Sequence, residues 1–114
     1  MKRIGYDEQH AQKLVPLLRS IVAEVHDRQE RIDELEECLE ELELQNLQSE
    51  EFYELRAALS HERREVLRSR KELSQLGCEL DLRDPLRVYI PGTDGELDHG
   101  FTWFADEELA DSSI

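Results

Sequence analysis

The sequence is poor in the residues that build disulfide frameworks, metal clusters and membrane spans. Its 114 residues include two cysteines, three prolines, five glycines and one tryptophan. Cys38 and Cys78 lie far apart and show no metal-ligand spacing, which indicates reduced thiols in a cytosolic setting. No stretch reaches the roughly 18 consecutive apolar residues of a membrane helix, and the start MKRIGYDEQH lacks the apolar region of a signal peptide. We therefore expect a cytoplasmic protein that does not enter a membrane.

Basic residues are also scarce, since 14 lysines and arginines stand against 28 aspartates and glutamates. The formal net charge of -14 repels other polyanions, so neither nucleic acid nor an anionic membrane is expected as a partner. The sequence also lacks a glycine-rich phosphate loop and a serine-histidine-aspartate arrangement. It therefore predicts no catalytic residues, no cofactor and no enzyme activity.

A seven-residue apolar repeat is the feature that the chain has in abundance. Large aliphatic residues alternate in steps of four and three, at Leu14, Leu18, Ile21, Val25, Ile32, Leu35, Leu39 and Leu42. A second run follows at Phe52, Leu55, Leu59, Val66, Leu73 and Leu76. This spacing holds one narrow apolar stripe along a helix and is typical of a coiled coil. The sequence predicts a long antiparallel two-helix hairpin over about residues 7–76.

The ends of these helices are marked by residues that favour caps and turns. Asp7 is suited to cap the first helix, and Ser49 can cap the second after a turn at 45–50. Gly77 follows the last apolar position and suits the left-handed conformation that ends a helix. Pro16 lies in the third turn, where it removes a backbone hydrogen bond, and we expect a kink there.

Two charged residues of opposite sign interrupt the apolar stripes. Folding the hairpin about its turn brings Arg28 close to Glu62, so we predict a partly buried ion pair that penalises other registers. The alternative is that both side chains extend to solvent. The first helix is acidic and the second basic, and flanking charges can therefore pair across the hairpin. The candidates are Glu36, Glu40 and Glu43 against Arg56, Arg63 and Arg64.

After Gly77 the apolar pattern changes to a period of two residues, which is typical of strands. Three strands are expected, at about 78–82, 86–90 and 97–104, with a proline-glycine turn between the last two. The fold class is therefore α+β and mainly α, in a single domain with a three-stranded antiparallel β-meander at about 78–104. An acidic tail at 105–114 is expected to fray.

Several short motifs resemble those of a known family. They are Tyr6-Asp7-Glu8, Leu14-Val15-Pro16, Leu76-Gly77-Cys78-Glu79-Leu80, Val88, Ile90-Pro91, a Gly/Asp turn, Trp103 and Glu107. In these motifs the chain is similar to domain of unknown function family 2203, uncharacterised proteins with a helical hairpin and a small sheet. Thr102 departs from the cysteine that the family often has there, and the family's later tryptophan-histidine segment has no counterpart. The resemblance implies the fold and transfers no reaction.

A second apolar strip beside the main one predicts self-association. Val15, Leu17 and Val22 form this strip near Pro16, and one small sheet covers it only in part. Two hairpins that pack side by side would bury it in a four-helix bundle. We therefore expect a non-catalytic structural or protein-interaction module that forms a homodimer and can bind a further protein partner.

The alternative function is a small-ligand or metal site between the aromatic sheet and the N-terminal helix. Tyr89 and Trp103, together with Phe101 and His99, could line such a site or simply form the packing face of the sheet. Metal ligation could also come from the pairs His26 with Glu30 and His61 with Glu65, spaced i to i+4. Such spacings arise by chance in so acidic a chain, so no bound metal is expected.

Overall fold

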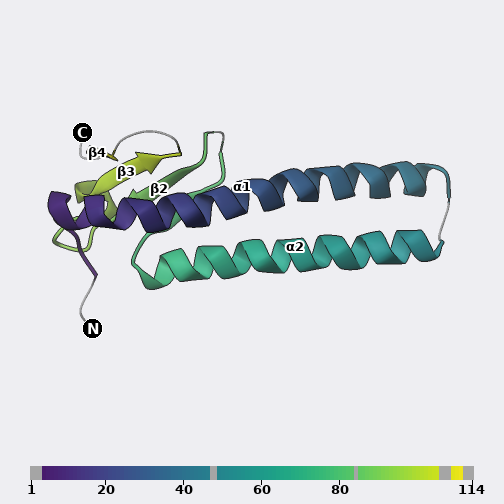
Figure 1. The fold of residues 1–114 in the computed structure, drawn as a ribbon, viewed down its shortest axis with the longest axis horizontal. Helices are drawn as coiled ribbons and strands as arrows, with labels where there is room; N and C mark the ends of the chain where they lie inside the picture. Colours follow the sequence, from purple (N-terminus) through teal and green to yellow (C-terminus); the bar gives the residue numbers. More distant parts are fainter. Residues whose placement is uncertain (1–3, 47–48, 84, 106–108, 112–114) are drawn as a thin grey trace. The chain divides into compact units, whose positions relative to one another are not determined.

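The computed structural model describes residues 4–46, 49–83, 85–105 and 109–111. Two helices come first, α1 (Glu8–Leu44) and α2 (Glu50–Gln75). The strands β1 (Glu79–Asp81), β2 (Arg87–Ile90), β3 (Phe101–Phe104) and β4 (Leu109–Asp111) follow, with the short 3-10 helix η1 (Leu97–His99) before β3 (Figure 1). The mainly helical α+β fold that the sequence predicts is confirmed. No helix in the described part of the chain combines the length and apolar character needed to cross a membrane.

Local hydrogen bonds explain where the helices begin and end. The Oδ1 atom of Asp7 accepts the backbone N–H of His10 at 2.8 Å, which caps the start of α1. After α2, Gly77 adopts a φ of 79°, and its N–H and that of Cys78 both donate to carbonyl groups of the last turn. This is a Schellman motif, whose left-handed residue is usually glycine. The predicted caps at Asp7 and Gly77 are confirmed.

The chain forms two compact units, of which the first, the hairpin unit, spans Glu24–Arg68. In this unit α1 and α2 run antiparallel and side by side (Figure 1). Its core is a single line of buried apolar side chains, namely Val25, Ile32, Leu39, Phe52, Leu59 and Val66. Leu35, Leu42 and Leu55, on the same line, are half-buried. The predicted apolar seam is confirmed here, and it is one side chain wide.

The second unit, the sheet unit, comprises residues 1–23 and 69–114. Its strands are neighbours in the order β1-β2-β3-β4, and all pairs are antiparallel. Val88 of β2 lies opposite Leu80 of β1 and Trp103 of β3, so these three side chains share one face of the sheet. The core of the unit contains them together with Ala11, Leu18, Ile21, Val22, Leu73, Cys78 and Ile90, all at most 6% exposed.

The sheet differs from the predicted meander in two places. Residues 97–99 form η1 and not the start of a strand, because backbone groups there bond locally. Asp94 accepts the N–H of Glu96 at 2.9 Å, and the N–H of Gly100 donates to Leu97 at 3.2 Å. The second difference is β4, which pairs with β3 where the sequence predicts a fraying tail. The rest of that tail, 106–108 and 112–114, lies outside the described residues.

Candidate functional site

A network of charged side chains crosses the seam of the hairpin unit. Arg28 Nη1 lies 2.9 Å from Glu62 Oε2, and Arg31 Nε lies 3.5 Å from Glu62 Oε1. Arg28 Nη2 also contacts Glu24 at 2.9 Å and Glu65 at 3.9 Å. The Glu24 and Glu62 carboxylates both raise the pKa of the Arg28 guanidinium. The ion pair predicted between Arg28 and Glu62 is confirmed.

The two partners of this pair are buried to different degrees. The Glu62 side chain is 7% exposed, whereas that of Arg28 is 24% exposed. Removing a buried carboxylate from water is costly unless opposite charge and hydrogen bonds compensate for it. Glu62 therefore depends on the two arginines of α1, and only a register close to the observed one supplies both. The pair should therefore favour a register close to the observed one.

On one face of the hairpin unit, α1 carries acidic side chains and α2 carries basic ones. Residues three and four positions apart lie on one side of a helix. On α1 they form an acidic stripe, which consists of Asp33, Glu36, Glu40 and Glu43. On α2 they form a basic stripe, which consists of Tyr53, Arg56, Ser60, Arg63 and Leu67. All nine residues are exposed.

An ion pair shows that the two stripes lie side by side on the same face. Arg63 Nη2 lies 2.7 Å from Glu36 Oε1, as the predicted pairing of flanking charges requires. Tyr53 and Leu67 are large apolar side chains in the basic stripe, and they are 57% and 63% exposed. Sequence reasoning found the charges but missed these two residues, because neither belongs to the apolar repeat. Their three- and four-residue spacing from Arg56 and Arg63 was the available signal.

The three residues of the predicted apolar strip near Pro16 are buried to different degrees. Val22 is 2% exposed and belongs to the core of the sheet unit. Val15 is half-buried, and only Leu17, at 47% exposed, remains open to solvent. The strip was expected to be covered only in part, and the structure shows which part: the chain covers Val22 and leaves Leu17 open. A dimer interface cannot be centred on Val22 without unfolding this core.

Tyr89 and Trp103 do not line one pocket, because they lie on opposite faces of the sheet. Trp103 pairs with Val88 and is 1% exposed, so it belongs to the core. Tyr89 pairs with Thr102, the neighbour of Trp103, and therefore points to the other face. The packing interpretation fits Trp103. The binding site that was predicted from both aromatic residues has no common surface on which to form.

On that other face, Tyr89 takes part in a cluster around a carboxylate. Its hydroxyl group donates to Asp81 Oδ2 at 2.9 Å, and Arg83 Nη2 donates to the same atom at 2.6 Å. The hydrogen bonds from Arg83, and then that from Tyr89, hold the pKa of Asp81 well below its ordinary value. A carboxylate held in its charged form by four donor atoms, three of Arg83 and one of Tyr89, is a poor general base. The cluster ties β1 to β2 and has no group free for catalysis.

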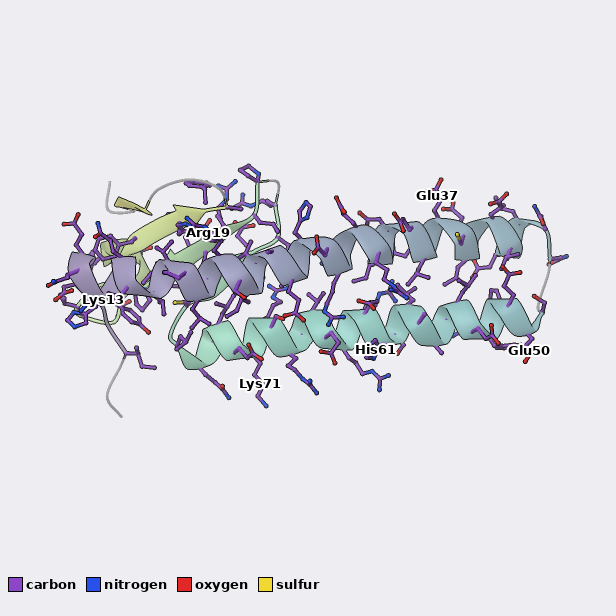
Figure 2. The ribbon with its side chains drawn as sticks, in the orientation of Figure 1. Lys13, Arg19, Glu37, Glu50, His61 and Lys71 are labelled. Carbon is purple, nitrogen blue, oxygen red and sulfur yellow. The ribbon has the colours of Figure 1, made fainter. Side chains whose placement is uncertain are left out.

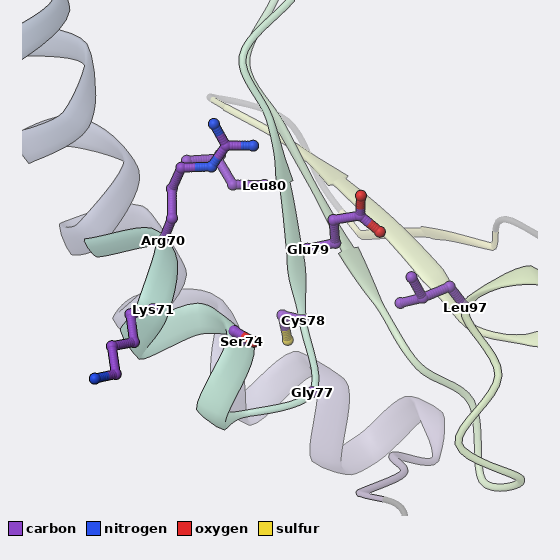
Figure 3. Close-up of a pocket in the computed structure, with 8 residues that line it drawn as sticks. All are labelled: Arg70, Lys71, Ser74, Gly77, Cys78, Glu79, Leu80 and Leu97. Carbon is purple, nitrogen blue, oxygen red and sulfur yellow. The ribbon is translucent and has the colours of Figure 1, made fainter. Parts of the chain in front are cut away.

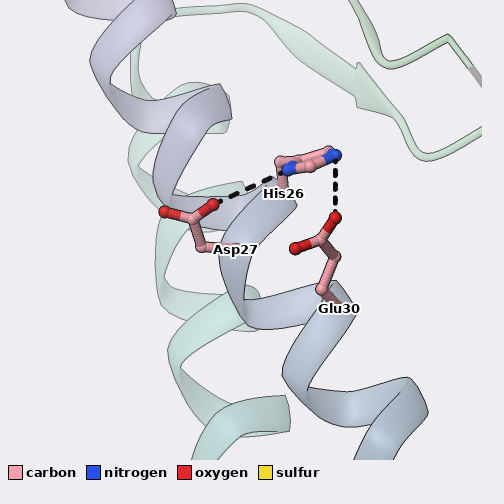
Figure 4. Close-up of side chains that lie close together, drawn as sticks. All are labelled: His26, Asp27 and Glu30. Carbon is pink, nitrogen blue, oxygen red and sulfur yellow. Dashed lines mark ion pairs between the residues drawn. The ribbon is translucent and has the colours of Figure 1, made fainter.

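The histidine candidates for metal ligation are exposed on the helices. The two His26 ring nitrogens face different carboxylates, with Nδ1 at 3.6 Å from Asp27 and Nε2 at 3.7 Å from Glu30 (Figure 4). One ligand atom from each of His26, Asp27 and Glu30 nevertheless lies within 4.8 Å of the other two, and all three side chains are exposed. His61 points away from α1 (Figure 2), and Glu65 instead contacts Arg28 and Arg68. Within the described residues, only the predicted pair of His26 with Glu30 has its ligand atoms close together, and exposed acidic groups of this kind are common without an ion.

Comparison with known proteins identifies the family of this chain. No curated protein and no solved structure matches the chain. A match does exist to one protein family, and it covers residues 5–110, which is nearly the whole chain. The match extends over both helices and the strands, as the shared motifs around Leu76–Leu80 and Trp103 predict. The chain therefore belongs to the family described as "Uncharacterized conserved protein (DUF2203)".

Proposed function

We propose that the protein is a non-catalytic interaction module that self-associates through its helical hairpin. The observation that carries this proposal is the separation of charge on one face of the hairpin unit. There the acidic stripe of α1 lies beside the basic stripe of α2, with Glu36 paired to Arg63. Tyr53 and Leu67 add exposed apolar surface to the same face. Apolar side chains within a charged surface are typical of protein-protein contacts.

A second copy of the chain fits this face by symmetry. Rotating the copy by half a turn about an axis parallel to the helices brings each acidic stripe onto the basic stripe of the other chain. The contact is isologous and closed, so the assembly stops at two chains. Tyr53 and Leu67 leave water in both copies, and the charges fix the orientation. The product is a four-helix bundle of antiparallel neighbours.

The compartment that suits this module is the cytoplasm. Both cysteines, Cys38 and Cys78, are free thiols. Free thiols are the normal state in a reducing compartment. The proposed homodimer needs no disulfide, because its contacts are the two charged stripes and the apolar residues within them.

Exchanging one apolar residue of the basic stripe tests the interface. Leu67→Glu places a carboxylate opposite the acidic stripe of the second copy, and we expect the dimer to weaken at least about tenfold. The matched control is Leu44→Glu, because Leu44 is 82% exposed and lies outside both stripes. Molar mass by light scattering at about 10–100 μM gives the readout. A monomeric wild-type protein, or equal effects of the two substitutions, would overturn the proposal.

Charge exchange between two variants is a sharper test. A variant with Arg56→Glu and Arg63→Glu presents two acidic stripes. A variant with Asp33→Lys, Glu36→Lys, Glu40→Lys and Glu43→Lys presents two basic ones. Each should be monomeric alone because like charges meet across the dyad, and mixing them should restore a dimer as a heterodimer. Circular dichroism verifies that both variants are helical. Failure of the folded variants to associate on mixing would contradict the proposed orientation.

A further inference from the structure

A groove of about 490 Å³ lies beside β1 in the sheet unit. Arg70, Lys71 and Ser74 line it from the end of α2, and Glu79 and Leu80 line it from β1. Figure 3 shows the α2 residues on one side of β1 and Leu97 on the other. The groove therefore lies along an open side of this strand and not beneath a closed surface.

The strand beside the groove is at the end of the sheet. β1 pairs with β2 through Glu79, Leu80 and Asp81, and within the described residues no other strand pairs with it. A terminal strand presents backbone N–H and C=O groups that can pair with a further strand. Addition of an extended segment to such an edge is a common mode of peptide recognition.

The charge beside the groove, two cations of α2 against the single carboxylate of Glu79, indicates what kind of segment fits. In a chain with twice as many acidic as basic residues, Arg70 and Lys71 are adjacent cations, and neither forms an ion pair with any described residue. The guanidinium group of Arg70 extends along the groove toward Leu80, whereas Lys71 points outward (Figure 3). Leu80 is 4% exposed and closes the base with an apolar surface. Carboxylates would pair with the cations while branched apolar side chains cover this base.

We propose that the open edge of β1 and the adjacent groove form a docking site for an extended acidic segment of a partner protein. The segment adds beside β1 as a further strand, and its backbone supplies the hydrogen bonds. Its carboxylates lie against Arg70 and Lys71. The residues that line this site belong to the sheet unit, whereas both stripes belong to the hairpin unit.

The experiment uses a fluorescent peptide of sequence Val-Glu-Val-Asp-Val-Glu-Val and the full-length protein. Binding is measured by fluorescence polarisation, and the site by NMR shifts of the backbone amides of Glu79–Asp81. Reversing one charge of the groove, in Arg70→Glu, should weaken binding about tenfold. The matched control is Arg64→Glu, which makes the same charge change on an exposed residue of the hairpin unit. This control should retain at least half of the wild-type affinity.

Two further peptides separate strand addition from charge attraction alone. N-methylation of alternate backbone amides removes donors that a new strand needs, so it should abolish binding. Replacement of the acidic residues by lysine should also abolish binding, because the cations then repel the peptide. The proposal is overturned by no binding of the acidic peptide at about 1 mM. It is also overturned by full affinity of the N-methylated peptide, or by an equal loss in the Arg64→Glu and Arg70→Glu variants.

Discussion

The hairpin unit and the sheet unit bury their apolar residues in different ways. In the hairpin unit each helix has one apolar line, and residues on it such as Leu35 and Leu55 stay half-buried. In the sheet unit the same helices meet a sheet as well, and Leu18, Val88 and Trp103 are at most 1% exposed. A helix pair without a third layer cannot enclose its seam, whereas a sheet adds a second covering surface. The stability of the two regions should therefore depend on different residues.

The largest expected difference concerns the two cysteines, one in each unit. Burial raises the pKa of the Cys78 thiol to about 12 from an ordinary 9.0, while Cys38 is exposed. Because the thiolate is the reactive form, the buried Cys78 should react with iodoacetamide at least about a hundredfold more slowly than the exposed Cys38 in the folded protein. Mass spectrometry of the labelled peptides over time measures both rates. Rates that differ in the folded protein and become equal in urea would agree with this expectation; similar rates without denaturant would contradict it.

A matched truncation in each unit compares the cores directly. Leu18→Ala removes a side chain that is 0% exposed in the sheet unit, and we expect a loss of about 4 kcal/mol in the free energy of unfolding. Leu35→Ala makes the same change at a half-buried position of the hairpin unit, where a loss of about 2 kcal/mol is expected. Urea denaturation followed by circular dichroism measures both. Equal losses would show that the two cores are equally enclosed.

Within the hairpin unit, breaking the buried ion pair should lower the free energy of unfolding more than breaking the exposed one. Glu62→Ala leaves Arg28 and Arg31 without their shared carboxylate and should cost about 2 kcal/mol. Glu36→Ala breaks the exposed pair with Arg63, and a loss below about 1 kcal/mol is expected. Thermal and urea unfolding provide the comparison.

Replacing both charged residues of the buried pair distinguishes the effect of the pair on stability from its effect on the register of the helices. Arg28→Leu combined with Glu62→Leu should preserve or raise the melting temperature, because no charge is then desolvated. The same double variant should form a broader set of oligomers, since leucines accept several registers. A single well-defined species by native mass spectrometry would show that the pair is not what selects the register.

The smallest effect is expected in the turn of the sheet unit and depends on pH. His99 Nδ1 lies 2.6 Å from Asp94 Oδ2, and this carboxylate raises the pKa of the imidazole above 6.5. The charged pair therefore stabilises the fold at pH values below 6.5 and loses its contribution as the pH rises through the raised pKa. Asp94→Asn should lower the pKa of His99 in an NMR titration, and should lower the melting temperature only at acid pH. An unchanged pKa of His99 in the Asp94→Asn variant would show that the two side chains do not form a charged pair.

Most of the helical part could be predicted from the sequence, because its determinants are local. The seven-residue repeat requires a long amphipathic helix wherever it occurs, and Asp7 and Gly77 act on backbone groups within a few residues. The ion pair of Arg28 with Glu62 was also predictable, since a hairpin with a known turn has few registers. These features need no knowledge of what else packs against the helices.

The candidate sites were harder to predict, because their members are brought together by sheet pairing and by exposure. Tyr89 and Trp103 both read as residues of an aromatic sheet, and only the pairing register assigns them to opposite faces. The strip that contains Val22 was expected to be covered in part, and only the tertiary fold shows that Val22 is a covered residue in a closed core. At Gly100 a Cβ would overlap the carbonyl oxygen of Ile90, a constraint that arises only once β2 and the turn meet.

The sequence by itself therefore determined the helices, their ends and the acidic and basic character of each one. The physical reason is that periodicity, capping and charge act within a single helix or between neighbours along it. Only the tertiary structure decided which apolar residues remain exposed, which sheet face each aromatic residue occupies, and where the open edge of β1 lies beside Arg70. Those properties depend on contacts between residues far apart in the chain, and local patterns do not encode which surface is left over.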